Sequence, residues 1–162
     1  MAESSDYDAG EWKGHVWDTP SAAKSTWDTN AGRSYVKAKE EKKTVADLVP
    51  KSITTDCARP LVIYVDVTGS MGNWPKVMFS KLPHMEIEAK EYLGKEMEVA
   101  FGAIGDQYSD TYPLQVQPFA KGLKLADTMQ ALVIEGNGGG DQKESYQLAA
   151  LYAAKNIEIP NA

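Results

Sequence analysis

Apolar residues follow two different spacings along the second half of this chain. A run at residues 61–65, rich in β-branched side chains, predicts a strand that is buried on both faces, as strands of parallel sheets are. A second apolar run, at residues 97–104, predicts another strand. Between them, apolar residues recur about every fourth position over residues 74–93, which predicts a helix that Pro83 kinks or divides. The pattern therefore predicts a right-handed strand–helix–strand unit.

Three further elements are expected on the same grounds. Residues 112–119 alternate between apolar and polar types but contain prolines, which predicts an edge strand. Residues 124–135 and 144–155 carry apolar side chains at helical spacing, and the glycines at 136–140 end the first of these helices. Strands that alternate with helices are typical of an α/β fold with a mainly parallel sheet.

Polar side chains follow the first strand at a spacing of two residues. Asp66, Thr68 and Ser70 come at its carboxyl end, which is where parallel sheets place their ligands. A tight turn through Gly69 would aim one carboxylate and two hydroxyl groups at a single point. Oxygen ligands of this kind suit a hard divalent cation. The sequence therefore predicts a Mg²⁺-type site at the tip of this strand.

These residues resemble the metal-ion-dependent adhesion site (MIDAS) of the von Willebrand factor A (vWA) domain family, in the branch that reads Asp-x-Thr-Gly-Ser-Met, here Asp66 to Met71. The resemblance continues through the strand that precedes Asp106 and the glycine loop at 138–145. It implies a Rossmann-like fold whose mainly parallel central sheet has helices on both faces, with residues 57–162 as the N-terminal part of such a domain. It also implies a protein-binding module in which bound Mg²⁺ (or Mn²⁺ or Ca²⁺) coordinates a carboxylate of the partner.

Two more acidic residues belong to the predicted site. Asp141, in a Gly-Gly-Gly-Asp loop, stands where the adhesion branch of the family has Thr, and the resemblance implies that it is a fourth metal ligand. Alternatively, Asp141 caps the helix that follows, with Glu144 completing a capping box. Asp106 follows the second strand at the same sheet edge and is a candidate to support the ligands. Asp110 is interpreted as a turn residue.

The resemblance stops short of a complete domain. The family's third metal loop would follow another strand after residue 156, and no such strand is expected in residues 157–162. We therefore expect a truncated vWA fold, or one whose sheet is completed in a homo- or hetero-oligomer.

Residues 1–56 differ from the rest of the chain. Asp, Ser, Thr and Gly interrupt the apolar runs there, so an irregular N-terminal extension is expected, with a short solvent-exposed helix within residues 38–48. The tripeptide Trp-Asp-Thr occurs twice in it, beginning at Trp17 and at Trp27. These indole rings either pack back onto the domain or anchor a partner protein, because Trp is favoured at the centres of interfaces.

Composition narrows the function classes. The 162 residues are 43% hydrophobic and 25% charged, which is ordinary for a globular protein. A net charge of −6 argues against nucleic acid as the partner, because binding to a phosphate backbone requires a basic surface. No apolar run is long enough for a membrane span and the first residues do not resemble a signal peptide, so a cytoplasmic location without membrane contact is expected. Cys57 is the single cysteine and is interpreted as a small apolar residue.

Two other functions stay open. Residues 66–70 also resemble the phosphorylation motif of P-type ATPases, in which Asp66 would accept a phosphoryl group, but Val67 stands where that motif has Lys. No complete catalytic constellation is present, so an enzyme is not expected. In a structural reading, the metal site is vestigial and the domain is an assembly piece. Under the binding hypothesis, Asp66→Ala abolishes partner binding and leaves the metal-free fold intact or more stable, because clustered carboxylates repel one another.

Overall fold

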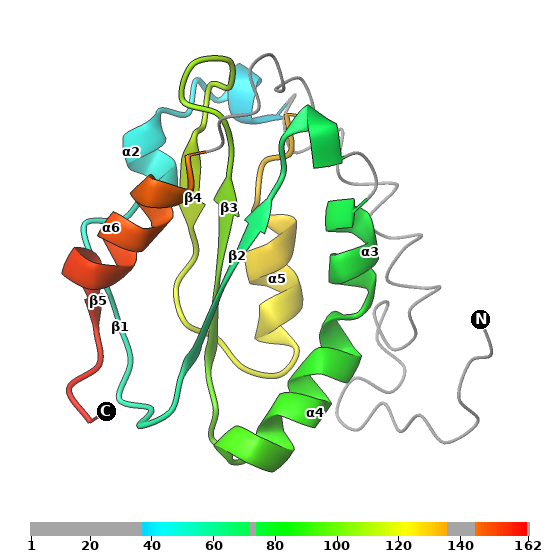
Figure 1. Cartoon of the computed structure of the whole chain (residues 1–162), viewed down its shortest axis with the longest axis vertical. Coiled ribbons are helices and arrows are strands. Elements are labelled where there is room, and N and C mark those ends of the chain that lie inside the picture. Colours follow the sequence, from blue (N-terminus) through cyan, green and yellow to red (C-terminus); the bar gives the residue numbers. More distant parts are fainter. Residues whose placement is uncertain (1–36, 72–73, 136–144, 162) are drawn as a thin grey trace.

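The computed structural model describes residues 37–71, 74–135 and 145–161. Its central feature is a three-stranded sheet in the order β2-β3-β4 (Figure 1). β2 (Leu61–Asp66) and β3 (Val99–Ile104) run parallel, and β4 (Leu114–Val116) is antiparallel to β3. The chain is therefore a mixed α/β protein with a parallel strand pair, in agreement with the spacing of its apolar residues.

The two parallel strands differ in burial. All residues of β3 are buried, because β2 and β4 flank it and helices cover both of its faces. Among the described residues, β2 has a neighbouring strand at one edge only, and its residues 61–64 are half-buried. The expectation that residues 61–65 are buried on both faces is therefore wrong for most of β2. An apolar run indicates what the strand faces and not whether each edge has a neighbour.

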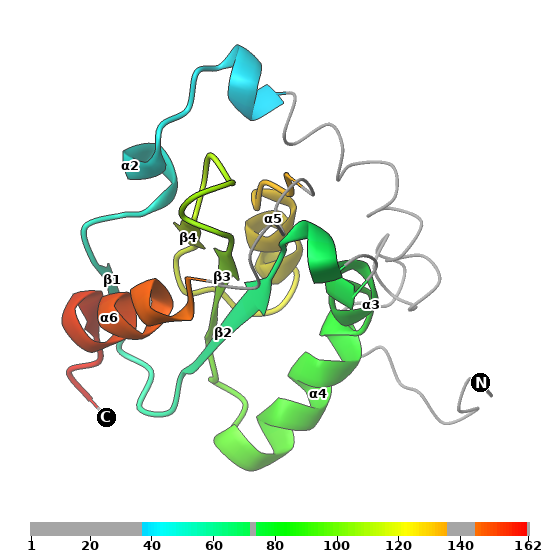
Figure 2. The same cartoon turned by 45° about the horizontal axis from the view of Figure 1, so that its top comes forward.

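The alternation of side chains along the strands separates two apolar cores. One core lies on the face that α4 (Leu82–Leu93) and α5 (Lys124–Gln130) cover, and its buried members include Val65, Val99, Phe101 and Met129. The other lies on the face of α6 (Tyr146–Asn156), and its buried members include Ala100, Ile104, Ala149 and Tyr152. Figures 1 and 2 both show α4 and α5 on one side of the sheet and α6 on the other. Helices therefore cover both faces of the sheet.

Two helices connect β2 to β3, where one kinked or divided helix was predicted. α3 (Trp74–Ser80) ends before Lys81, and α4 begins at the next residue with Pro83 in its first turn. Proline is tolerated there because the first N–H groups of a helix have no acceptor within the helix. The predicted break is confirmed.

The last two helices differ modestly from their predicted bounds. α5 was expected to reach residue 135 but ends at Gln130, and residues 131–135 are turn and irregular. α6 was expected over 144–155 and occupies Tyr146–Asn156. Within the described ranges, none of the helices has the length and apolar character needed to cross a membrane.

The described part of the N-terminal segment is regular where an irregular extension was expected. Residues 37–40 are helical, and α2 (Val45–Leu48) and β1 (Ile53–Thr54) follow. β1 pairs in parallel with β5 (Ile157–Glu158), although no strand was expected after residue 156. The helical residues 37–40 and 45–48 agree with the short helix expected within residues 38–48, whereas the expectation of no strand after residue 156 is wrong. Strands of two residues leave no periodic pattern in a sequence, which is why reasoning from periodicity missed them.

The phenol of Tyr64, on β2, lies against the backbone of β3. A Cβ atom placed on Gly102 would lie 2.4 Å from the Tyr64 ring, so this approach requires glycine. The Tyr64 hydroxyl is buried and has no hydrogen-bond partner among the described residues. Burial, with a smaller contribution from Tyr152, raises the pKa of Tyr64 to about 12. The Tyr64 hydroxyl therefore stays neutral and is buried without a hydrogen bond to the described residues.

Tyr64→Phe is expected to stabilise the fold by about 1 kcal/mol, because it removes an unsatisfied buried hydroxyl and keeps the ring. In the wild type, the pKa of Tyr64 in the folded state exceeds the ordinary value of 10.0. Its ionisation therefore leaves the free energy of unfolding unchanged below pH 10 and lowers it as the pH rises toward 12. Urea unfolding at pH 7 and pH 11 measures both effects. A loss of stability at pH 7 in Tyr64→Phe would contradict this account.

Candidate functional site

The predicted site residues lie at the carboxyl ends of the two parallel strands. Asp66 is the last residue of β2 and pairs in register with Ile104, the last residue of β3. Gly105 and Asp106 follow directly, so the loops after both strands leave the sheet at the same edge. This is the edge at which parallel sheets bind ligands.

Asp66 and Thr68 form one hydrogen-bonded turn. The Asp66 Oδ1 atom accepts hydrogen bonds from the backbone N–H of Thr68, at 2.9 Å, and from its hydroxyl, at 2.7 Å. Gly69–Met71 then form a single 3-10 turn, in which the N–H of Met71 donates to the carbonyl of Thr68. Asp66 and Thr68 are 8% and 2% exposed. The sequence spacing thus becomes a compact turn with a carboxylate and a buried hydroxyl in contact.

Tyr146, the first residue of α6, reaches the same carboxylate. Its hydroxyl donates a hydrogen bond of 2.7 Å to the Asp66 Oδ2 atom. Both Asp66 oxygens therefore accept hydrogen bonds from within the chain. Sequence reasoning missed Tyr146, although its place directly after the glycine loop was a usable signal.

Asp106 lies at the predicted edge but turns its carboxylate toward its own loop. It accepts hydrogen bonds from the N–H of Tyr108, at 2.7 Å, and from the hydroxyl of Ser109, at 2.8 Å. These bonds, that of Tyr108 first, lower the pKa of Asp106. Asp106 is 2% exposed, so it orders the loop after β3.

Asp110 is more than the turn residue that the sequence suggested. Its Oδ2 atom accepts the N–H of Asp106 at 2.8 Å, while its Oδ1 atom is buried with no hydrogen-bond partner in the described part of the chain. Loss of hydration raises the pKa of Asp110, and the nearby carboxylates of Glu135, Asp106 and Asp66 add to this effect. A Cβ atom on Gly105 would lie 2.7 Å from the Asp110 Oδ2 atom, so glycine permits this approach.

The residues on either side of the glycine loop both contact the loop that follows β3. The carboxylate of Glu135 accepts the N–H groups of Thr111 and Tyr112, at 2.8 and 2.7 Å. Ser145 accepts the N–H of Gln107 at its hydroxyl, at 3.0 Å. Glu135 and Ser145 therefore both lie at the edge of the sheet that carries Asp66.

Several predicted site residues lie wholly or partly outside the described part of the structure. Asp141, Trp17 and Trp27 lie outside the described residues, and for Ser70 the structure describes only the backbone, which belongs to the 3-10 turn. Within the described ranges, no three His, Cys, Asp or Glu side chains are arranged to hold a metal ion. Of the predicted ligands, the structure thus brings together Asp66 and Thr68.

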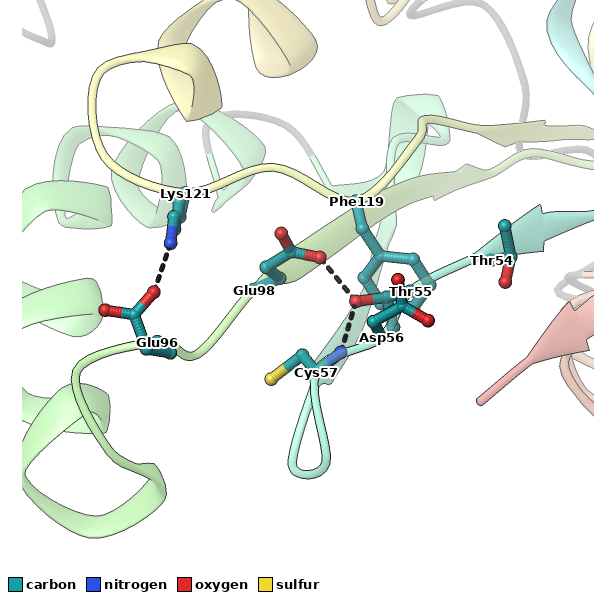
Figure 3. Close-up of a pocket in the computed structure, with 8 residues that line it drawn as sticks. All are labelled: Thr54, Thr55, Asp56, Cys57, Glu96, Glu98, Phe119 and Lys121. Atoms are coloured by element: carbon teal, nitrogen blue, oxygen red, sulfur yellow. Dashed lines mark hydrogen bonds and ion pairs between the residues drawn. The ribbon is translucent and has the colours of Figure 1, made fainter. Parts of the chain in front are cut away.

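A pocket of about 520 Å³ lies at the opposite, amino-terminal end of the parallel strands (Figure 3). The residues that line it are Thr54, Thr55, Asp56, Cys57, Glu96, Glu98, Phe119 and Lys121. Much of its polar lining is paired internally: Lys121 contacts Glu96 at 2.5 Å, and the Thr55 hydroxyl donates to Glu98. The pocket is thus separate from the Asp66 site.

Comparisons of the chain with models of protein families, with curated proteins and with solved structures found no match.

Proposed function

We propose that this chain is a metal-dependent protein-binding module with a Rossmann-like, vWA-type fold, and that Asp66, Thr68 and Ser70 hold a divalent cation. The observation that carries the proposal is the Asp66–Thr68 turn at the carboxyl end of β2. A parallel strand pair with helices on both faces supports the fold assignment. The remaining ligands are assigned from the spacing of the motif.

The chemistry of the donor set fits a hard cation. The carboxylate of Asp66 and the hydroxyl of Thr68 are oxygen ligands of the kind that Mg²⁺ and Ca²⁺ prefer. The buried Oδ1 atom of Asp110 and the neighbouring carboxylates leave negative charge that no basic residue neutralises by an ion pair among the described contacts. A cation at this edge would offset that charge.

The ends of the glycine loop support a role for Asp141 as a fourth ligand. Glu135 and Ser145, which border the glycine loop in sequence, both contact the loop after β3 and so lie beside the site. When bound, Mg²⁺, Mn²⁺ or Ca²⁺ would supply an open coordination position for a carboxylate of a partner protein. Within the chain, Asp66 and Thr68 orient the site, and the loop after β3 supports it.

Binding of Mn²⁺ to the metal-free chain, followed by electron paramagnetic resonance, tests the proposal. The expected result is saturable binding of a single ion, displaced by Mg²⁺ and lost in Asp66→Ala. Glu88→Ala is the control, because Glu88 is an exposed acid on α4. Equal binding by the wild type and Asp66→Ala would reject the assignment of the site.

Tyr146→Phe is expected to tighten metal binding about fivefold. The Tyr146 hydroxyl occupies the Asp66 Oδ2 atom, and a net hydrogen bond of about 1 kcal/mol corresponds to about this factor. Tyr108→Phe is a matched control, because the Tyr108 side chain is 77% exposed and only its backbone N–H bonds Asp106. The same Mn²⁺ titration measures both variants. Unchanged affinity in Tyr146→Phe would mean that the cation does not use the Asp66 Oδ2 atom.

A structural role is the second candidate function. It is favoured by the internal hydrogen bonds that satisfy both Asp66 oxygens without a cation. Phosphoryl transfer to Asp66 gains no such support, because no Lys or Arg forms an ion pair with Asp66 among the described residues, and this chemistry depends on positive charge at the phosphoryl group. We therefore do not propose an enzyme.

A further inference from the structure

The outer edge of β2 carries backbone groups that are directed away from β3, and no strand lies beside this edge among the described residues. The N–H of Leu61 donates to Glu98, and the N–H of Val67 donates to Ile104. Because successive residues of a strand direct these groups to opposite edges, Val62 and Tyr64 direct theirs away from β3. In the parallel register of β2 and β3, Leu61, Ile63 and Val65 bond β3, so the backbone groups of Val62 and Tyr64 have no partner in β3.

The two edges of the sheet differ in their protection. β4, at the other edge, has only three residues, and Pro113 and Pro118 stand close to its ends. Prolines and short length are features that discourage a further strand from pairing. β2 is six residues long, and although Pro60 directly precedes it, its residues 61–65 contain no proline and no charged side chain. Residues 61–64 are also half-buried, which leaves apolar surface available along this edge.

We propose that the edge of β2 pairs antiparallel with β2 of a second copy of this chain, across a twofold axis at Ile63. In this register, Val62 of one copy faces Tyr64 of the other and exchanges two hydrogen bonds with it. Leu61 faces Val65, so apolar side chains meet on both faces of the joined sheet. The two three-stranded sheets become one continuous sheet.

Charge favours this register and this occupant. The paired run is uncharged, so no like charges face each other although each copy carries a net charge of −6. The two Asp66 residues are six positions apart along the joined strands, which is about 20 Å and beyond the range of unscreened repulsion. The segment 1–36 of the same chain fits less well, because polar residues and glycine interrupt its apolar runs. Asp66 of each copy lies just beyond the paired run of residues 61–65.

Disulfide trapping tests the register on the chain of residues 1–162. In a Cys57→Ser background, Ile63→Cys places two thiols opposite each other at a Cα separation of about 4.5 Å, within the range of a disulfide. Leu61→Cys is the matched control on the same strand and face, with about 14 Å between the two equivalent Cα atoms. Mild oxidation with diamide, which accepts the two electrons and two protons, should link Ile63→Cys dimers and leave Leu61→Cys unlinked.

Sedimentation equilibrium on the unmodified wild-type chain completes the test. A concentration-dependent dimer, together with selective trapping of Ile63→Cys, is the expected result. A monomer at all concentrations would overturn the proposal. A dimer that traps neither variant, or both equally, would also overturn it, because the copies would then meet through another surface. Neither result depends on whether Asp66 binds a metal.

Discussion

Replacing Glu86 with Ala is expected to lower the free energy of unfolding by about 1–3 kcal/mol, because it removes the acceptor of a buried backbone N–H and breaks a partly buried ion pair. Glu86, on α4, is 0% exposed. One carboxylate oxygen, Oε1, accepts the N–H of Gly122 at 2.7 Å and contacts the Lys90 ammonium at 3.1 Å. Without it, the Gly122 N–H loses its acceptor and the 23% exposed Lys90 loses this contact. Urea unfolding followed by circular dichroism measures the loss.

Two variants make this prediction specific. Glu86→Gln keeps an oxygen that can accept the N–H of Gly122 and loses only the charge beside Lys90, so its cost is expected to be clearly smaller. Glu88→Ala removes another acid of α4 that is 54% exposed, and is expected to change stability by less than about 0.5 kcal/mol. Similar losses in Glu86→Ala and Glu88→Ala would contradict the role given to Glu86.

Asp66→Ala is expected to destabilise the metal-free chain by about 2–4 kcal/mol. Two effects oppose each other at this residue. Removing the charge relieves repulsion with Asp110, whose pKa is raised in part by Asp66. It also removes the carboxylate oxygen that accepts hydrogen bonds from the buried N–H and hydroxyl of Thr68, and losing each of these bonds costs about 1–3 kcal/mol. The hydrogen bonds outweigh the repulsion, because Asp66 makes the smallest of the contributions that raise the pKa of Asp110.

The expected change in stability has the opposite sign to the expectation from the sequence, which considered only charge repulsion. Thermal unfolding in EDTA measures it, and Asp66→Asn is the matched variant because its amide oxygen still accepts from Thr68. Asp66→Asn should recover about half of the loss or more. A metal-free Asp66→Ala chain as stable as the wild type would show that the turn at Asp66 contributes little to the fold.

The sequence predicted the parts of the fold that carry a long apolar period. β3 lies within the predicted run 97–104, and Pro83 divides the connecting helices as expected. β1 and β5 were missed because each is two residues long and depends on a partner more than 100 positions away. Pairing of this kind is set by tertiary contacts, which local patterns do not report.

The sequence predicted the part of the candidate site whose residues are close together in the chain. Asp66 and Thr68 share one turn, so their spacing alone indicated that they meet. Tyr146 and Asp110 are 80 and 44 residues away from Asp66 in sequence. Only the tertiary fold brings the Tyr146 hydroxyl and the Asp110 carboxylate near Asp66. The buried Glu86 also escaped notice, because its neighbour across the chain is a backbone N–H, and every residue except proline has one.

The response of the thermal midpoint to Mg²⁺ tests the central claim most directly. A ligand present at ten times its dissociation constant stabilises the folded state by about 1.4 kcal/mol, which raises the midpoint by roughly 3–6 °C in a chain of this size. We predict this rise when Mg²⁺ replaces EDTA in the wild type, and no rise in Asp66→Ala. A cooperative wild-type transition with the same midpoint in EDTA and in Mg²⁺ would contradict the claim that Asp66 and Thr68 hold a divalent cation.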